Sequence, residues 1–439
     1  LGRCGGTVAL ASGASQTGFG RTGTVDWQTT PKTATFTAVS GEGYFANTSG
    51  GTAFNMNLPA GVAGAIVSVA DYAATFQTTN LTVVPNGTDK IGSINQNAVL
   101  DVQGQSVTFV FVDSTQGWIN TMDSTSNVRG TPPYIGATGG TETEDGNFKI
   151  HTFTGPGTFQ VNRLSPTAPQ NFVDYIVIAG GGGGGYNPGA PSPDGGRGGG
   201  GGAGGYRESP GAIGCYTSSP LGVAPAAALP VSVTSYPITV GAGATSSTPV
   251  TRGNSSVFSS ITSTGGGNGG VGQHVTPADT RPGTPGGSGG GSGTYAGAGS
   301  IGNGNTPPVS PPQGQNGGLG VEGSPAYGAG GGGGAGGVGT NGSAPTAGPG
   351  GNGTASGITG ASVTRAGGGG GATQAAAPTA GTGGPGGGGA GAALGCAPSS
   401  GVAGTANTGS GGGGSGGLNY GGPGGNGGSG VVIVRYRFQ

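Results

Sequence analysis

Residues 172–185 read Phe-Val-Asp-Tyr-Ile-Val-Ile-Ala-Gly-Gly-Gly-Gly-Gly-Gly, an apolar, strand-like run that continues directly into six glycines. This stretch divides the chain into two parts of different composition. Of the 114 glycines, 24 precede Gly180 and the other 90 lie from Gly180 to the C-terminus. Charge has the opposite distribution, because 18 of the 29 charged residues, including all three lysines, precede Gly180. We therefore expect a part built of strands, followed by a part built mainly of glycine.

The composition of the 439 residues excludes several classes of protein. The formal net charge is −1 and only 7% of residues are charged. A nucleic-acid-binding protein needs clustered Lys and Arg to displace counterions, so we expect no nucleic-acid partner. The chain contains no apolar run near the roughly 20 residues of a membrane helix, so we also expect no membrane insertion. Collagen is excluded because segments such as residues 206–210, Tyr-Arg-Glu-Ser-Pro, break its three-residue glycine period.

Short β-branched runs bounded by turn residues predict that the first part is all-β. Examples are Ile66 to Tyr72 and Ser106 to Asp113, and no helical period longer than about two turns accompanies them. We predict a β-sandwich or meander over residues 24–124. Residues 1–23 are expected to link it to a larger assembly, and residues 125–141, with two consecutive prolines, to form a connector.

A β-hairpin is predicted within residues 142–179. Two alternating runs, 147–153 and 158–161, flank the turn-forming sequence Gly155-Pro156-Gly157. Two short alternating runs around such a turn are typical of antiparallel strands in one sheet.

The strand of residues 172–178 is expected to close the glycine-rich domain of residues 180–439. The chain ends in a similar run at 430–438, Gly-Val-Val-Ile-Val-Arg-Tyr-Arg-Phe, and we predict that the two strands pair. Two further strand-like runs, at 237–240 and 256–261, could extend the same small sheet.

The glycine runs allow one ordered structure. Fixing a backbone costs about 1–2 kcal/mol per residue, and glycine loses the most freedom, so a disordered coil is the default expectation. Glycine runs can instead form extended helices of the polyproline II kind, with three residues per turn. Without Cβ atoms such helices can pack side by side, bonded amide to carbonyl. We predict an all-β fold in which packed polyglycine II helices are framed by a small β-sheet.

The segments between the glycine runs carry Pro, Ser, Thr and Asn with isolated Tyr and Arg, and we predict that they form loops at the ends of the bundle. Tyrosine offers broad amphipathic contact at low entropic cost, a property that binding loops use. The alternative is that these tyrosines cover the glycine lattice. The candidate binding residues are Tyr186, Arg197, Tyr206, Arg207, Tyr216, Tyr295, Tyr327 and Tyr420.

Residues that could support catalysis or metal binding are sparse. The alternation around His151 indicates a structural place on a strand face, and His274 is expected to be a solvated loop residue rather than a metal ligand. Glu142, Glu144 and Asp145 form a solvated turn or, with carbonyl oxygens, a Ca²⁺ site. A glycosidase needs two carboxylates facing a cleft, and no acidic residue lies in an informative motif. We expect no cofactor and no enzymatic activity.

The three cysteines, Cys4, Cys215 and Cys396, are too few and too widely spaced for a disulfide framework. Cys215 and Cys396 could pair. The alternative is that the cysteines are small buried thiols.

Three segments of the first part carry a resemblance to a known family. They are 24–34 (Thr-Val-Asp-Trp-Gln-Thr-Thr-Pro-Lys-Thr-Ala), 39–45 (Val-Ser-Gly-Glu-Gly-Tyr-Phe) and 111–120 (Phe-Val-Asp-Ser-Thr-Gln-Gly-Trp-Ile-Asn). The region resembles a β module of fibre and structural proteins of tailed bacteriophages, particularly marine ones.

The second part carries a related resemblance. Residues 148–159 (Phe-Lys-Ile-His-Thr-Phe-Thr-Gly-Pro-Gly-Thr-Phe), the strand entering the glycine runs and the closing 430–436 (Gly-Val-Val-Ile-Val-Arg-Tyr) resemble the glycine-rich domain of phage tail proteins. The strand motifs carry this resemblance, because glycine runs alone are not specific.

The resemblance implies an external appendage of a virion, often a homotrimer. It implies an adhesin that attaches the particle to its host through loops of residues 180–429, and other virion fibre or tail proteins as partners. The receptor would be a host cell-surface glycan or outer-membrane protein. Two alternatives remain open: a purely structural fibre mounted on capsid or neck, and a polysaccharide depolymerase.

Overall fold

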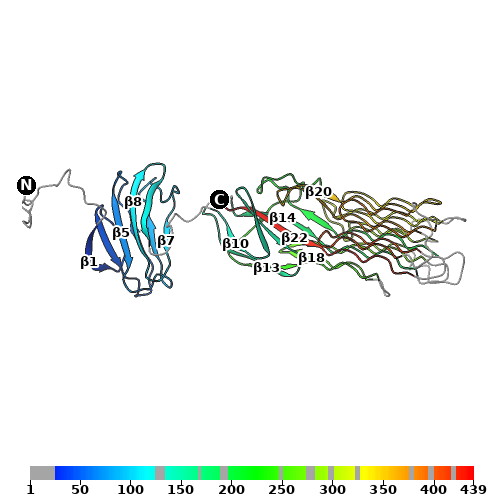
Figure 1. Ribbon diagram of the computed structural model, residues 1–439, viewed down its shortest axis with the longest axis horizontal. Coiled ribbons are helices and arrows are strands. Elements are labelled where there is room, and N and C mark those ends of the chain that lie inside the picture. The colour runs from blue at the N-terminus through cyan, green and yellow to red at the C-terminus, as the bar shows by residue number, and fades with distance from the viewer. Residues whose placement is uncertain are drawn as a thin grey trace, which may run out of the picture. The chain divides into compact units, whose positions relative to one another are not determined.

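The computed structural model divides the chain into two compact units, residues 1–133 and 134–439, and each is described by itself (Figure 1). Its described residues contain strands and no α-helix, and none of their elements is a helix able to cross a membrane. The described residues are 25–123, 134–166, 170–187, 196–246, 251–272, 282–294, 301–321, 327–374, 380–393, 400–416 and 422–439.

The first unit is a sandwich of two sheets. Apolar side chains from both sheets form one core, in which Met56, Val67, Phe109 and Trp118 are fully buried. One sheet has the order β1 (Asp26–Lys32), β3 (Glu42–Ala46), β5 (Ile66–Asp71), β8 (Ser106–Asp113), β9 (Gly117–Asp123). The other has the order β2 (Phe36–Thr37), β4 (Phe54–Asn57), β6 (Leu81–Val84), β7 (Ala98–Leu100).

The path of the chain decides between the two predicted arrangements of this unit. Strands β1 to β6 alternate between the two sheets, so that β1, β3 and β5 run parallel, as do β2, β4 and β6. A meander would make consecutive strands antiparallel neighbours. The sandwich is therefore confirmed and the meander is wrong. After each of the strands β1 to β5, the chain crosses to the facing sheet before the next strand begins.

Two sheets also form one end of the second unit (Figure 1). The first has the order β11 (Thr141–Asp145), β12 (Phe148–Phe153), β22 (Val431–Arg437), β14 (Phe172–Ile178), β15 (Tyr206–Glu208), and β16 (Leu229–Pro230) also pairs with β14. The second has the order β10 (Gly136–Thr138), β13 (Gly157–Arg163), β17 (Ser235–Thr239), β18 (Ser256–Phe258), β19 (Ile261–Ser263). A separate ribbon pairs β20 (Thr354–Ser356) with β21 (Val363–Arg365).

The predicted pairing of the entering and closing strands is confirmed. Strands β14 and β22 are antiparallel neighbours, with Ile176 opposite Ile433. Both strands are buried on both faces. Val177 and Val432 pack into the core shared with the second sheet, whereas Ile176 and Ile433 pack into a core shared with lattice residues. This explains their continuous apolar sequence, since a strand covered on both faces needs no alternation.

Three sequence predictions for this end need correction. Strands β12 and β13 flank the Gly155-Pro156-Gly157 turn but lie in different sheets, and the actual hairpin joins β11 to β12 through Gly146. Strands β17 and β18 belong to the second sheet rather than to that of β14. The predicted connector, 125–141, contains β10, whose small residues gave no strand signal.

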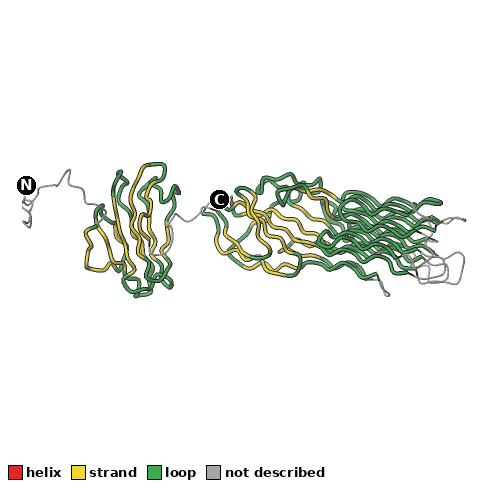
Figure 2. Tube along the Cα trace, in the orientation of Figure 1, coloured by secondary structure: helices red, strands yellow, loops and turns green. Residues whose placement is uncertain are grey.

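The glycine-rich segments form a lattice of extended rods bonded through their main chains (Figure 2). In one rod, the amides of Gly200, Gly201 and Gly202 donate to three different neighbours, at Gly330, Gly412 and Gly267. The next three residues repeat the order of these neighbouring rods: residues 203, 204 and 205 donate to residues 333, 409 and 264. A partner that recurs every third residue is the pattern of polyglycine II helices with three residues per turn. The predicted packing is therefore present.

Glycine is required because the rods touch backbone to backbone. A Cβ placed on Gly184 would lie 1.9 Å from the carbonyl oxygen of Gly413, and one on Gly200 would lie 2.0 Å from that of Gly369. Neither neighbour is the movable end of a side chain, so neither can give way. At such positions the rods can approach closely enough to form hydrogen bonds of about 0.5–1.5 kcal/mol net each only because the Cβ is missing.

We predict that Gly184→Ala destabilises the glycine-rich unit by about 3 kcal/mol or more, at or above the upper range for overpacking, because backbone has to move. The control is Gly155→Ala, since a Cβ at Gly155 meets nothing within 4 Å. Hydrogen exchange read by mass spectrometry on the full chain separates peptides of the two units. Equal exchange in both variants would contradict the close contact.

Candidate functional site

The eight candidate binding residues do not form one cluster. One group lies at the strand end of the lattice: Tyr206 and Arg207 on β15, and Tyr216 in the loop after it. The other group, Tyr186, Arg197 and Tyr327, lies at the opposite end of the lattice, close to segments that the structure does not describe. Tyr295 and Tyr420 lie outside the described residues.

Tyr206 is not available to a receptor. It is buried on β15, with 1% of its surface exposed, and its hydroxyl donates to Glu208 at 2.9 Å. Tyr216 is half-buried, and the guanidinium of Arg435 lies 5.8 Å from its ring centroid. Burial is the main cause that raises the pKa of both tyrosines. Both tyrosines thus pack at the junction between sheet and lattice, Tyr206 buried and Tyr216 half-buried, and the neighbouring Arg207 is half-buried on the same strand as Tyr206.

Glu208 is the centre of a buried network at this junction. One carboxylate oxygen accepts the Tyr206 hydroxyl and the Ser219 amide, the latter at 3.0 Å, and the other accepts the Ser356 hydroxyl at 2.6 Å. Burial lowers the pKa of the nearby Arg365, and Glu208 partly offsets this effect. The carboxylate thus ties β15, the following loop and the β20–β21 ribbon together.

A second buried carboxylate, Asp174 on β14, fixes the same loop. It accepts the Ser209 hydroxyl at 2.7 Å and the Gly214 amide. Opposite it on β22, Arg435 donates to the Gly214 carbonyl at 2.7 Å and to Asp145 at 2.9 Å. Arg435 is thus ion-paired with Asp145 and Asp174 is hydrogen-bonded, so buried polar contacts join the strands and the loop at this end of the unit.

The lattice end is where the described chain borders most of the gaps. Hydrogen bonds join the residues beside different gaps to one another. Asn187 bonds Gly422 in both directions at 3.1 Å, and Gly272 donates to the Tyr186 carbonyl at 3.3 Å. The same holds for the pairs Arg197–Thr294, Gln374–Tyr327 and Thr373–Ala392, whereas Val321 and Gly328 bond across a single gap.

These pairs form one continuous surface, which we call the tip face. Ser415 links two groups of them, since its amide donates to Gly185 and its carbonyl accepts from Gly198, and Gly198 in turn accepts from Ala372. Segments 188–195, 273–281, 295–300, 322–326, 375–379, 394–399 and 417–421 thus each begin or end beside it.

The candidate residues on the tip face differ in exposure. Arg197 is fully buried and donates to the Gly196 carbonyl at 2.9 Å, and Tyr327 is 7% exposed. Both side chains are buried and support the face from within. Tyr186 is half-buried and is the one described candidate that the structure leaves partly accessible there.

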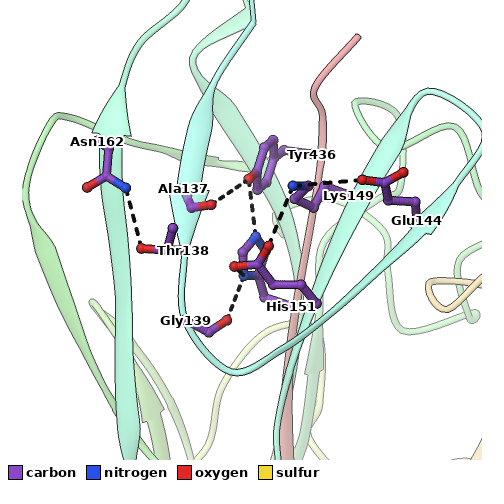
Figure 3. Close-up of polar contacts among 9 residues, drawn as sticks. Ala137, Thr138, Gly139, Glu144, Lys149, His151, Asn162 and Tyr436 are labelled. Carbon is purple, nitrogen blue, oxygen red and sulfur yellow. Dashed lines mark hydrogen bonds and ion pairs between the residues drawn. The ribbon is translucent and has the colours of Figure 1, made fainter. Parts of the chain in front are cut away.

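His151 lies in a packed polar cluster between the two sheets (Figure 3). Nδ1 is 2.7 Å from the Gly139 carbonyl, so it carries the proton and donates it. Nε2 lies 3.1 Å from the Tyr436 hydroxyl, and the two rings are stacked at 5.6 Å. Burial lowers the pKa of His151, although a Glu142 carboxylate oxygen 3.8 Å from Nδ1 acts in the opposite direction. The predicted structural role fits this geometry.

The other candidate sites are accounted for as follows. Glu142, Glu144 and Asp145 form the exposed strand β11 rather than a turn. Within the described residues, no group of three or more His, Cys, Asp or Glu is placed to hold a metal ion. Cys215 is a free, exposed thiol, so neither pairing nor burial holds for it, and Cys4, Cys396 and His274 lie outside the described residues.

The fold and the tip face define an all-β protein whose larger unit is a polyglycine lattice closed at one end by strands. A model of the glycine-rich domain family matches residues 154–437, more than half of the chain. The chain therefore belongs to this family, and the match includes the entering strand β14, the lattice and the closing strand β22. No curated protein matches the chain in sequence.

We predict that Glu208→Leu destabilises the glycine-rich unit by about 3 kcal/mol or more, because it leaves two hydroxyls, an amide and a nearby arginine without their buried carboxylate. Glu144→Leu is the control, with an expected change within about 0.5 kcal/mol, since the Glu144 side chain is 57% exposed. The free energy of unfolding of each variant is measured by denaturant titration, monitored by the hydrogen exchange of amides in β15. Similar losses in the two variants would disprove the role of the network.

We predict that acid weakens this unit through His151. Its pKa is lowered in the folded state, so below about pH 6.5 the unfolded chain binds a proton that the folded chain resists. The contribution of this group to the free energy of unfolding is complete above pH 6.5. It decreases as the pH is lowered below that value, by at most about 1.4 kcal/mol per pH unit. Calorimetry between pH 7.5 and 5 measures the slope. His151→Gln should remove this part of the slope, whereas His274→Gln should retain it.

Proposed function

We propose that this protein is a fibre component of a bacteriophage virion and that the tip face presents its receptor-binding residues to the host cell. The observation that carries the proposal is the difference between the two ends of the lattice. One end is filled by strands and by the buried carboxylates Asp174 and Glu208. At the other, seven segments of the chain begin or end on one bonded surface.

The physical properties of the lattice support this function. Rods bonded to several neighbours along their length form a stiff base, so the described residues of the tip face, such as Tyr186, lose little freedom when a ligand binds. The segments that border the tip face contain Tyr295, Tyr420 and His274 among Ser, Pro, Asn and Gly. This composition suits contact with a glycan or a protein surface.

The partners follow from the same proposal. The receptor would be a host cell-surface glycan or outer-membrane protein, and residues 1–23 would connect to other virion fibre or tail proteins. A homotrimer would present three tip faces, and repeated weak contacts multiply into high avidity when geometry lets them engage together. A structural fibre without a receptor is the alternative function.

We predict that tip variants lose host attachment. Segments 273–281 and 295–300 are each replaced by Gly-Ser sequences of equal length, and the adsorption of particles carrying them should fall at least tenfold, because the contact surface is lost while the lattice stays. The control is Cys215→Ser, which alters an exposed residue near the strand end.

Two results would overturn the proposal. Particles that assemble and adsorb normally with both replacements favour a purely structural fibre. Release of soluble sugar from host envelopes by the purified protein favours a depolymerase instead.

A further inference from the structure

Three aromatic side chains form a row across the outer face of the sandwich unit. Trp27 lies on β1, Phe45 on β3 and Tyr72 directly after β5. The ring centroids of Trp27 and Phe45 are 4.9 Å apart, and those of Phe45 and Tyr72 are 6.5 Å apart. The core does not use these rings: Trp27 is 39% and Tyr72 56% exposed. A row of aromatic rings left in water on a folded module is a candidate contact surface, since Trp and Tyr are enriched at interfaces.

The sheet holds the Trp27 indole in place. Gly43 is opposite Trp27, and a Cβ there would lie 2.8 and 2.9 Å from the indole atoms Cδ2 and Cε3. The indole thus lies over the bare backbone of Gly43 on one side and against Phe45, at an interplanar angle of 31°. Its remaining surface is open to solvent. Because the ring is fixed before any ligand arrives, binding costs little side-chain entropy.

The size and charge of the row indicate the kind of ligand. The exposed area of Trp27 and Tyr72 is on the order of 200 Å², given 150–250 Å² for a whole aromatic side chain. A stable protein interface buries about 800 Å² per partner, so this row is too small for a protein or a second copy of the chain. Ala70, the register partner of Phe45, is uncharged, and the residues that precede Trp27 and Tyr72, Asp26 and Asp71, are acidic, so a polyanion has no cation to pair with there.

A neutral sugar chain fits these properties. One face of a pyranose ring carries C–H groups that pack on an aromatic face, while its hydroxyls remain hydrated at the rim. The Tyr72 hydroxyl adds a hydrogen-bonding group at one end of the row. Neighbouring strands lie about 4.8 Å apart, so rings placed on successive strands can contact successive sugars of a chain that crosses the strands.

We propose that Trp27, Phe45 and Tyr72 form a binding site for neutral polysaccharide, with one pyranose ring stacked on the open face of Trp27 and a neighbouring sugar against Tyr72. The site belongs to the first unit, so the proposal does not rest on the tip face or on its proposed function. It gives the particle a second contact with glycan that does not depend on the lattice.

The chain offers a direct test because it has two tryptophans, and Trp118 is fully buried in the core. The full-length protein is titrated with neutral β-1,4-linked hexasaccharides of glucose, mannose and N-acetylglucosamine. We expect a saturable change in tryptophan emission with at least one of them. Calorimetric titration should give at least tenfold weaker binding for Trp27→Ala and several-fold weaker binding for Tyr72→Ala, with little dependence on salt.

The controls separate binding from folding. Met122→Ala, at a 59% exposed position on β9 of the same sheet, should bind like the unmodified protein. Trp27→Tyr retains an aromatic ring over Gly43 and should recover part of the affinity. The proposal is overturned if none of the three hexasaccharides binds, if Trp27→Ala binds with unchanged affinity, or if added salt abolishes the binding.

Discussion

Direct contact between main chains is the constraint on which the larger unit depends. In the lattice, successive amides of one rod donate to three different rods, as at Gly200, Gly201 and Gly202. At Gly200 this requires that the Cβ be absent, since a methyl group there would meet a carbonyl oxygen at 2.0 Å. The usual order of stabilisation is thereby reversed. An ordinary domain buries side chains and satisfies its backbone along the way, whereas this one satisfies its backbone and has few side chains to bury.

Such a lattice needs an end that fixes the order of its rods. The glycines of the rods carry no side chains that distinguish one neighbour from another, so other residues have to fix their register. Strands β14 and β22 do this, because they are antiparallel neighbours whose apolar faces are both buried. The carboxylates of Asp174 and Glu208 then attach the loop of residues 209–219 and the β20–β21 ribbon to the strands.

The sequence predicts which strands and rods exist in this architecture better than it predicts which of them pair. The pairing of β14 with β22 follows from two runs with apolar residues on both faces, and the rods follow from the glycine runs. The supposed hairpin at Gly155-Pro156-Gly157 failed because a local turn signal does not say whether the chain returns to the same sheet or crosses to the facing one. Likewise, the alternation of strands in the sandwich unit depends on long-range packing that short β-branched runs do not encode.

The candidate site shows the same limit at the level of single residues. Tyr206 directly follows a glycine run, as Tyr186 does, so the local sequence predicts a binding role for both residues equally. What separates them is the carboxylate of Glu208, whose partners Ser219 and Ser356 are 11 and 148 positions away in the chain. A buried acid among polar partners is the signal that could have placed Tyr206 in the joint, but it can be recognised only once those partners are known.

The two ends of the lattice impose different requirements on sequence. At the strand end, a change has to preserve a carboxylate, a hydroxyl or an apolar face that several segments share, as Glu208 does for Tyr206 and Ser356. At the tip face, the rods are held below the surface mainly by bonds between main-chain groups, such as that of the Gly198 amide with the Ser415 carbonyl. Segments between the rods can therefore change in length and composition without altering the support beneath them. A lattice bonded through its backbone thus separates stability from surface sequence, which is the property that a variable recognition surface requires.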